Sequence, residues 1–126
     1  MIQKHIFFLH RMNDHVQYLD KIKSTLAGKG SFKGTDCRCC ALGKWIYSDG
    51  VAYAAQFNAT ARQLFNDMVE AHERFHEASA RTLECQEIGD ELGQYRALTE
   101  MYQLSNQLVQ MLLRLDQMAN QESLIA

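Results

Sequence analysis

The chain has 126 residues, a length that suits one hydrophobic core, so we expect a single domain over residues 1–126. Hydrophobic residues make up 47% and charged residues 22%, and the formal net charge of −2 disfavours nucleic acid or an anionic membrane as a partner. No apolar run approaches the roughly 20 residues that a membrane span needs. We therefore expect a cytoplasmic protein whose thiols are reduced.

The first part of the chain predicts one long helix and one short helix. The sequence has no proline, and apolar residues at steps of three and four predict a helix from residue 2 to about residue 26, which Gly28 ends. Residues 29–36 are expected to form a loop, and Asp36 to cap a short helix that runs from the cysteines to about Tyr47. The predicted apolar stripe of the long helix is Ile2, Ile6, Leu9, Met12, Val16, Leu19, Ile22 and Leu26.

The second part predicts two more long helices, after a turn at residues 48–50. The second long helix is expected to begin between residues 51 and 58 and to end near Gln86. The last long helix is expected over residues 90–119, and residues 120–126 are expected to fray. The predicted apolar stripe of the last helix is Leu92, Tyr95, Tyr102, Leu108, Leu112, Leu115 and Met118.

These elements predict an all-α fold: a four-helix-bundle-like domain with an additional short helix that carries the segment after Cys40. Apolar residues with coiled-coil-like spacing at both ends of the chain indicate spare apolar surface. A homodimer would bury that surface. The alternative is that the same residues close the core of the monomer, and the pattern does not choose between the two.

Histidines on the predicted apolar faces are candidate metal ligands. His72 and His76 are four residues apart, so a helix places their Cβ atoms about 5–6 Å from each other. Buried imidazoles need a hydrogen-bond partner or a metal ion, and His15 faces inward from the first helix. The segment HERFH also fits H-E-x-x-H, in which Glu73 would be the general base of a zinc metalloprotease.

Three of the four cysteines lie together in CRCC, at Cys37, Cys39 and Cys40. The C-x-x-C of a redox enzyme opens a helix after a strand, and no strand pattern precedes this one. A C-x-x-C pair is also half of a structural zinc site, although a second pair is missing here. The segment that begins at Cys40, CALGKWIY, narrows these alternatives.

Three segments in order resemble the chemoreceptor zinc-binding domain family, CZB. They are H-x-x-Y-L from His15, C-x-L-G-K-W from Cys40 and H-x-x-F-H from His72, and the resemblance covers about residues 13–83. It implies one Zn²⁺ in a tetrahedral site on three separate helices. The ligands that it implies are His15, Cys40, His72 and His76.

Two further cysteines lie beside Cys40, so the residues alone allow more than one choice of cysteine ligand. Cys37 or Cys39 could compete with Cys40 for the metal, or act as a resolving thiol after Cys40 is oxidised. The sequence alone does not separate these roles.

The resemblance also implies a function. CZB domains are usually fused to chemoreceptors or to diguanylate cyclases, where they respond to zinc or to oxidants such as hypochlorous acid (HOCl). We therefore expect a stand-alone sensory or regulatory zinc module in bacterial signal transduction, in chemotaxis or cyclic-di-GMP control. We expect a homodimer with no enzymatic activity, and a chemoreceptor or diguanylate cyclase is the signalling partner implied.

Two alternatives remain beside this expectation. The first is a purely structural zinc-binding dimerisation domain. The second is a metalloprotease at HERFH, which is disfavoured because Cys40 would fill the position that a hydrolytic zinc leaves to water, and no histidine follows His76.

Overall fold

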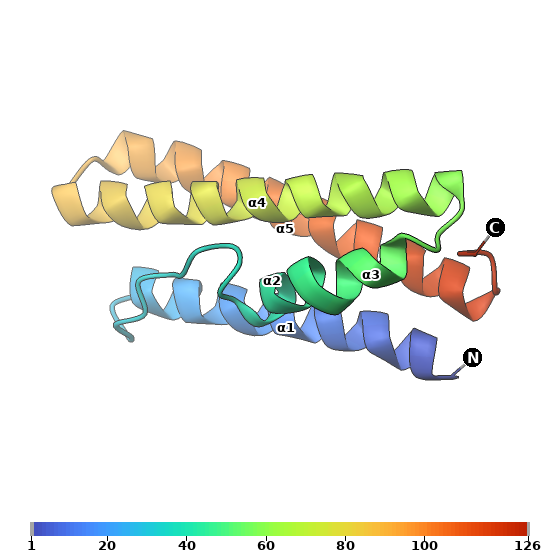
Figure 1. Cartoon of the computed structure of the whole chain (residues 1–126). Helices are drawn as coiled ribbons and strands as arrows, with labels where there is room; N and C mark the ends of the chain where they lie inside the picture. Colours follow the sequence, from blue (N-terminus) through green and yellow to red (C-terminus); the bar gives the residue numbers. More distant parts are fainter. Residues whose placement is uncertain (1, 126) are drawn as a thin grey trace.

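Three long helices frame the molecule, and a run of short helical segments fills a fourth position beside them (Figure 1). A computed structural model describes residues 2–125, with side chains from Phe8 onward. Every regular element in these residues is helical, which confirms the all-α, bundle-like prediction. The elements are α1 (Ile2–Leu26), α2 (Ala41–Trp45), the π-helical η1 (Ile46–Gly50), α3 (Val51–Ala54), α4 (Ala59–Ile88) and α5 (Glu91–Asn120).

Helices α4 and α5 form an antiparallel hairpin, and α5 also packs against α1 (Figure 1). The side chain of Asn58 caps α4 by accepting a hydrogen bond from the backbone N–H of Ala61 at 2.9 Å. Gly89 ends α4 in the left-handed conformation with φ +77°, which glycine adopts without strain. Asp90 then caps α5 through the N–H of Gly93, so three local signals fix the hairpin.

The run from α2 to α3 differs from the prediction at both ends. The predicted turn at residues 48–50 is wrong, because the chain continues there as η1 and reaches Ala54. Gly50 serves close packing: an added Cβ would meet the Trp45 carbonyl oxygen at 3.0 Å. Asp36 does not cap α2 but accepts the backbone N–H of Arg38 at 2.8 Å within the preceding loop.

The core lies between α1, α2, α4 and α5, and the end of the chain covers one side of it. Leu124 is buried, its carbonyl oxygen accepts the N–H of Asn58 at 2.7 Å, and Phe57 pairs with Ile125 in an isolated bridge. The predicted fraying of the tail is therefore wrong for residues up to 125. Large side chains that are fully buried include Phe8, Ile22, Leu42, Ile46, Met68, Phe75, Met101, Leu108, Leu112 and Leu115.

The predicted apolar stripe of α5 divides into two faces. Its later members, from Leu108 to Leu115, lie in the core, but Leu92, Tyr95 and Tyr102 are 61%, 67% and 40% exposed. Each residue turns a helix by about 100°, which places these three residues well away from the buried face. The prediction of one continuous stripe is wrong here, and the exposed residues form a second apolar face.

Helix α1 shows a similar division. Leu9 and Val16 are 38% and 41% exposed although both belong to the predicted stripe. Ile22 is fully buried, and the side chains of Ile2 and Ile6 lie outside the described residues.

No helix in the described part of the chain has the length and apolar character to cross a membrane.

Candidate metal centre

Three of the four predicted ligands meet in the core of the molecule. The ligand atoms of Cys40, His72 and His76 all lie within 4.8 Å of one another, and the three residues are at most 8% exposed. The Sγ of Cys40 lies 3.2 Å from Nε2 of His72, and the two imidazole centroids are 4.7 Å apart. The cluster arises because two histidines one turn apart on α4 face the residue that precedes α2.

Cys40 is held at the N-terminus of α2, where it is the capping residue. Its Sγ accepts the backbone N–H of Gly43 at 3.2 Å and lies 3.6 Å from the carbonyl oxygen of Cys37. A Cβ on Gly43 would overlap that same carbonyl group, so the glycine of the C-x-L-G-K-W segment is required for the loop to approach the helix. Burial raises the pKa of the Cys40 thiol, while the hydrogen bond from Gly43 lowers it.

The two histidines of α4 are neutral imidazoles with one nitrogen available on each. Burial, followed by the charges of the other histidines, lowers the pKa of His72 to about 3, and burial lowers the pKa of His76. Nδ1 of His76 donates to the carbonyl oxygen of Thr35 at 3.0 Å, which leaves the lone pair of Nε2 available to a metal. Nδ1 of His72 is buried and finds no hydrogen-bond partner among the described residues.

These features fit Zn²⁺. Zinc prefers imidazole nitrogen and thiolate sulfur, and it needs its histidine ligands unprotonated. Two neutral imidazoles and a thiol gathered in a buried cluster supply that donor set. The unpaired nitrogen of His72 indicates that the hydrogen bonds of the protein alone do not satisfy this cluster.

His15 lies beside the cluster rather than within it. It is 2% exposed, and its ring packs edge-on against Phe75 with centroids 4.6 Å apart. Its Nε2 shares a 2.8 Å hydrogen bond with Oγ of Ser105 on α5, and its nitrogens are outside the group of atoms within 4.8 Å. Burial, and then the charge of His76, lowers the pKa of His15 to about 4. The structure thus places three predicted ligands together and the fourth next to them.

The other candidates of the sequence do not join the cluster. Cys37 is half-buried and Cys39 is exposed, and neither contributes an atom to the group that contains Cys40. The carboxylate of Glu73 accepts a hydrogen bond from the hydroxyl of Tyr47, which ties α4 to η1. Arg38 stacks over the Tyr47 ring at 4.1 Å.

Three residues near the cluster were not predicted from the sequence. Tyr18 lies against His76 with ring centroids 4.6 Å apart, and its hydroxyl accepts the backbone N–H of Thr35 at 2.9 Å. Its position in H-x-x-Y-L, three residues after His15, was a signal that could have identified it. Thr35 acts through its backbone and Ser105 is remote in sequence, so neither offers a local pattern.

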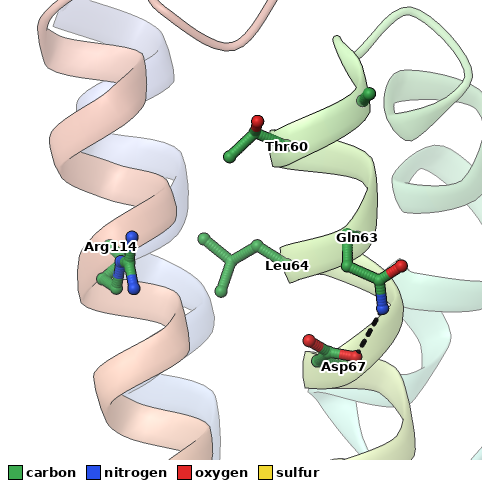
Figure 2. A pocket seen from close by; sticks show the side chains of 6 residues that line it. Thr60, Gln63, Leu64, Asp67 and Arg114 are labelled. Atoms are coloured by element: carbon green, nitrogen blue, oxygen red, sulfur yellow. Dashed lines mark hydrogen bonds between the residues drawn. The ribbon is translucent and has the colours of Figure 1, made fainter.

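Two cavities differ in their relation to the centre. A cavity of about 270 Å³ lies beside His76 and is also lined by Tyr18, Asp36 and Ser79. A second, of about 450 Å³, lies between the start of α4 and Arg114 of α5 (Figure 2). Its wall includes none of the three cluster residues. The wall residue nearest to them along α4, Asp67, precedes His72 by five residues and therefore lies on another side of the helix, so the cavity is separate from the centre.

The comparisons agree with the geometry of the site. No curated protein and no solved structure matches this chain. A family model described as the chemoreceptor zinc-binding domain matches residues 15–83, which is more than half of the 126 residues. That region begins at His15 and includes all three residues of the buried cluster. The chain belongs to the chemoreceptor zinc-binding domain family.

Proposed function

We propose that this protein is a zinc-binding sensory or regulatory module that holds one Zn²⁺ through His15, Cys40, His72 and His76. The observation that carries the proposal is the buried Cys40–His72–His76 cluster. Three imidazoles and one thiolate complete a four-coordinate site of the mixed cysteine and histidine type. His15 is the fourth ligand because it is buried, neutral and in contact with Phe75, which lies between the two histidines of α4.

The sensing chemistry that we propose takes place at Cys40. Zinc held by these residues would keep the thiol of Cys40 deprotonated, and a thiolate is the form that oxidants attack. With hypochlorite, the sulfur gives up two electrons and gains the oxygen atom to become a sulfenate, and chloride leaves. Cys40 also caps α2, so a change at its sulfur alters the start of the short helical run.

The second apolar face of α5 is where we propose that the module meets its partners. Leu92, Tyr95 and Tyr102 are large, exposed and on one side of the helix. We propose a homodimer through this face, which delivers the signal to a chemoreceptor or a diguanylate cyclase in chemotaxis or cyclic-di-GMP control.

A protease function has less support. A hydrolytic zinc needs an open position for water and a free general base. Here Cys40 is within 3.2 Å of His72, and the carboxylate of Glu73 is engaged by Tyr47. We propose that the module is not an enzyme. A Glu73→Gln variant should leave zinc content unchanged, and peptide hydrolysis by the wild type that this variant loses would reverse the proposal.

Metal content by mass spectrometry tests the proposed function. The wild type should carry one zinc per chain and release it when hypochlorite is added, whereas Cys40→Ala should bind zinc weakly. Zinc that stays bound after oxidation would favour a purely structural zinc site in a dimerisation domain. A wild-type protein that binds no zinc would refute both the sensory module and the structural zinc site.

A further inference from the structure

The contact between His15 and Ser105 joins two helices at positions 90 residues apart. Both side chains are buried, at 2% and 6% exposure, and the hydrogen bond between Nε2 and Oγ measures 2.8 Å. Other buried hydroxyl groups nearby bond to the backbone of their own helix: Ser79 to the carbonyl of His76, and Thr82 to that of Ala78. The hydroxyl of Ser105 is instead directed to an imidazole on another helix.

The same arrangement occurs at His76, where the assignment of the proton is unambiguous. The carbonyl oxygen of Thr35 can only accept, so Nδ1 of His76 carries the proton and Nε2 presents its lone pair. A hydroxyl can donate or accept, so the bond at His15 allows two tautomers. Nδ1 of His15, however, has no hydrogen-bond partner in the described part of the chain. It is therefore the nitrogen available to a metal. Zinc binding there requires an unprotonated Nδ1, so Nε2 then carries the proton and donates it to Oγ of Ser105.

We propose that Ser105 is a positioning residue for the zinc ligand His15. Its hydroxyl accepts Nε2–H and so fixes the tautomer that offers Nδ1 to zinc. The inference rests on the proposed function, and it brings α5 into the centre although α5 carries no candidate ligand. Ser105 lies beyond residues 15–83, so the role is not part of the matched family region.

Zinc affinity, measured by competition with a chromophoric chelator, tests the role of Ser105. The Ser105→Ala variant should bind Zn²⁺ about 10-fold more weakly or worse, as is usual when the hydrogen-bond partner of a ligand histidine is removed. Ser105→Thr keeps the hydroxyl and should restore most of the affinity. The matched control is Thr82→Val, which removes a buried hydroxyl bonded only within α4 and should leave affinity unchanged.

Two further measurements separate positioning from a general loss of structure. In a His15→Ala background, Ser105→Ala should cause no additional loss, since its effect runs through that imidazole. Side-chain ¹⁵N NMR of the metal-free protein should find His15 as the Nε2–H tautomer in the wild type and as a mixture in Ser105→Ala.

The outcomes distinguish this inference from the proposed function. Equal zinc affinity in wild type and Ser105→Ala, an equal loss in Thr82→Val, or an Nδ1–H tautomer in the wild type would overturn the role of Ser105 alone. A wild type that binds no zinc would overturn the proposed function, and the positioning of His15 for zinc would fall with it.

Discussion

Lowering the pH should destabilise the metal-free protein through its buried histidines, and His15 gives the clearest case. Its pKa is about 4 in the folded protein against 6.5 for an exposed histidine. Between these two pH values the unfolded chain binds more protons than the folded one. The stabilising contribution of neutral His15 is therefore complete above about pH 6.5, and it is lost as the pH falls toward 4.

The magnitude follows from the size of that pKa difference. A pKa lowered from 6.5 to about 4 corresponds to roughly 3 kcal/mol of unfolding free energy once the pH is below the folded-state value. Between pH 6 and pH 5 the unfolded residue is mostly protonated and the folded one is mostly not. His15 alone should then lower the unfolding free energy by about 1 kcal/mol over that single pH interval.

Urea unfolding in the presence of a chelator at pH 7.5, 6 and 5 measures this effect. The His15→Gln variant keeps a side-chain N–H for Ser105 but does not titrate, so its unfolding free energy should fall by about 1 kcal/mol less between pH 6 and pH 5. His10 lies on the surface, and His10→Gln is the control for the histidine-to-glutamine change itself. An identical fall in wild type and His15→Gln would refute the argument that burial holds this imidazole neutral.

Three other substitutions probe the neighbourhood of the centre and the second face of α5. Gly43→Ala should cost at least about 2 kcal/mol of unfolding free energy and weaken zinc binding, because the alanine methyl group would overlap the Cys37 carbonyl. An unchanged urea midpoint and an unchanged zinc content would contradict this prediction. Tyr47→Phe should cost about 1–2 kcal/mol of unfolding free energy through the lost bond to Glu73, yet keep one zinc per chain by mass spectrometry. A loss of zinc would show that the metal centre depends on this bond. Tyr95→Glu places a charge on the exposed apolar face of α5, so it should shift the protein toward monomer in analytical ultracentrifugation. It should change the unfolding free energy of the monomer by less than about 0.5 kcal/mol. A dimer unaffected by this substitution would show that the interface does not include this face.

The sequence predicted the features that depend on local geometry. A spacing of four residues on a helix is enough to bring His72 and His76 together, and the predicted limits of the last two long helices fall within a few residues of those of α4 and α5. Cys40 required a different kind of signal, because a cysteine before a short helix has no periodic pattern. Only the resemblance in the C-x-L-G-K-W segment singled it out from its two neighbouring cysteines.

The features that the sequence missed depend on contacts between distant segments. The choice between core and surface for Leu92 or Tyr102 depends on which side of α5 meets α1 and α4, and an apolar pattern alone does not specify it. Gly50 has a turn-forming composition around it but packs against Trp45 instead. The tail is ordered by Leu124, which fills the core beside the start of α4.

The location of the cluster also determines which part of the fold depends most on the metal. Helix α2 has five residues, far fewer than a helix needs to be stable by itself in water. Its cap is Cys40, and the proposed partners of that sulfur lie on other helices, so zinc binding would contribute directly to the folding of this short run. The α4–α5 hairpin has its own caps and core contacts and depends on the metal far less. Oxidation of Cys40 would therefore act first on α2 and η1, while Ser105 connects the same centre to the helix that bears the exposed apolar face.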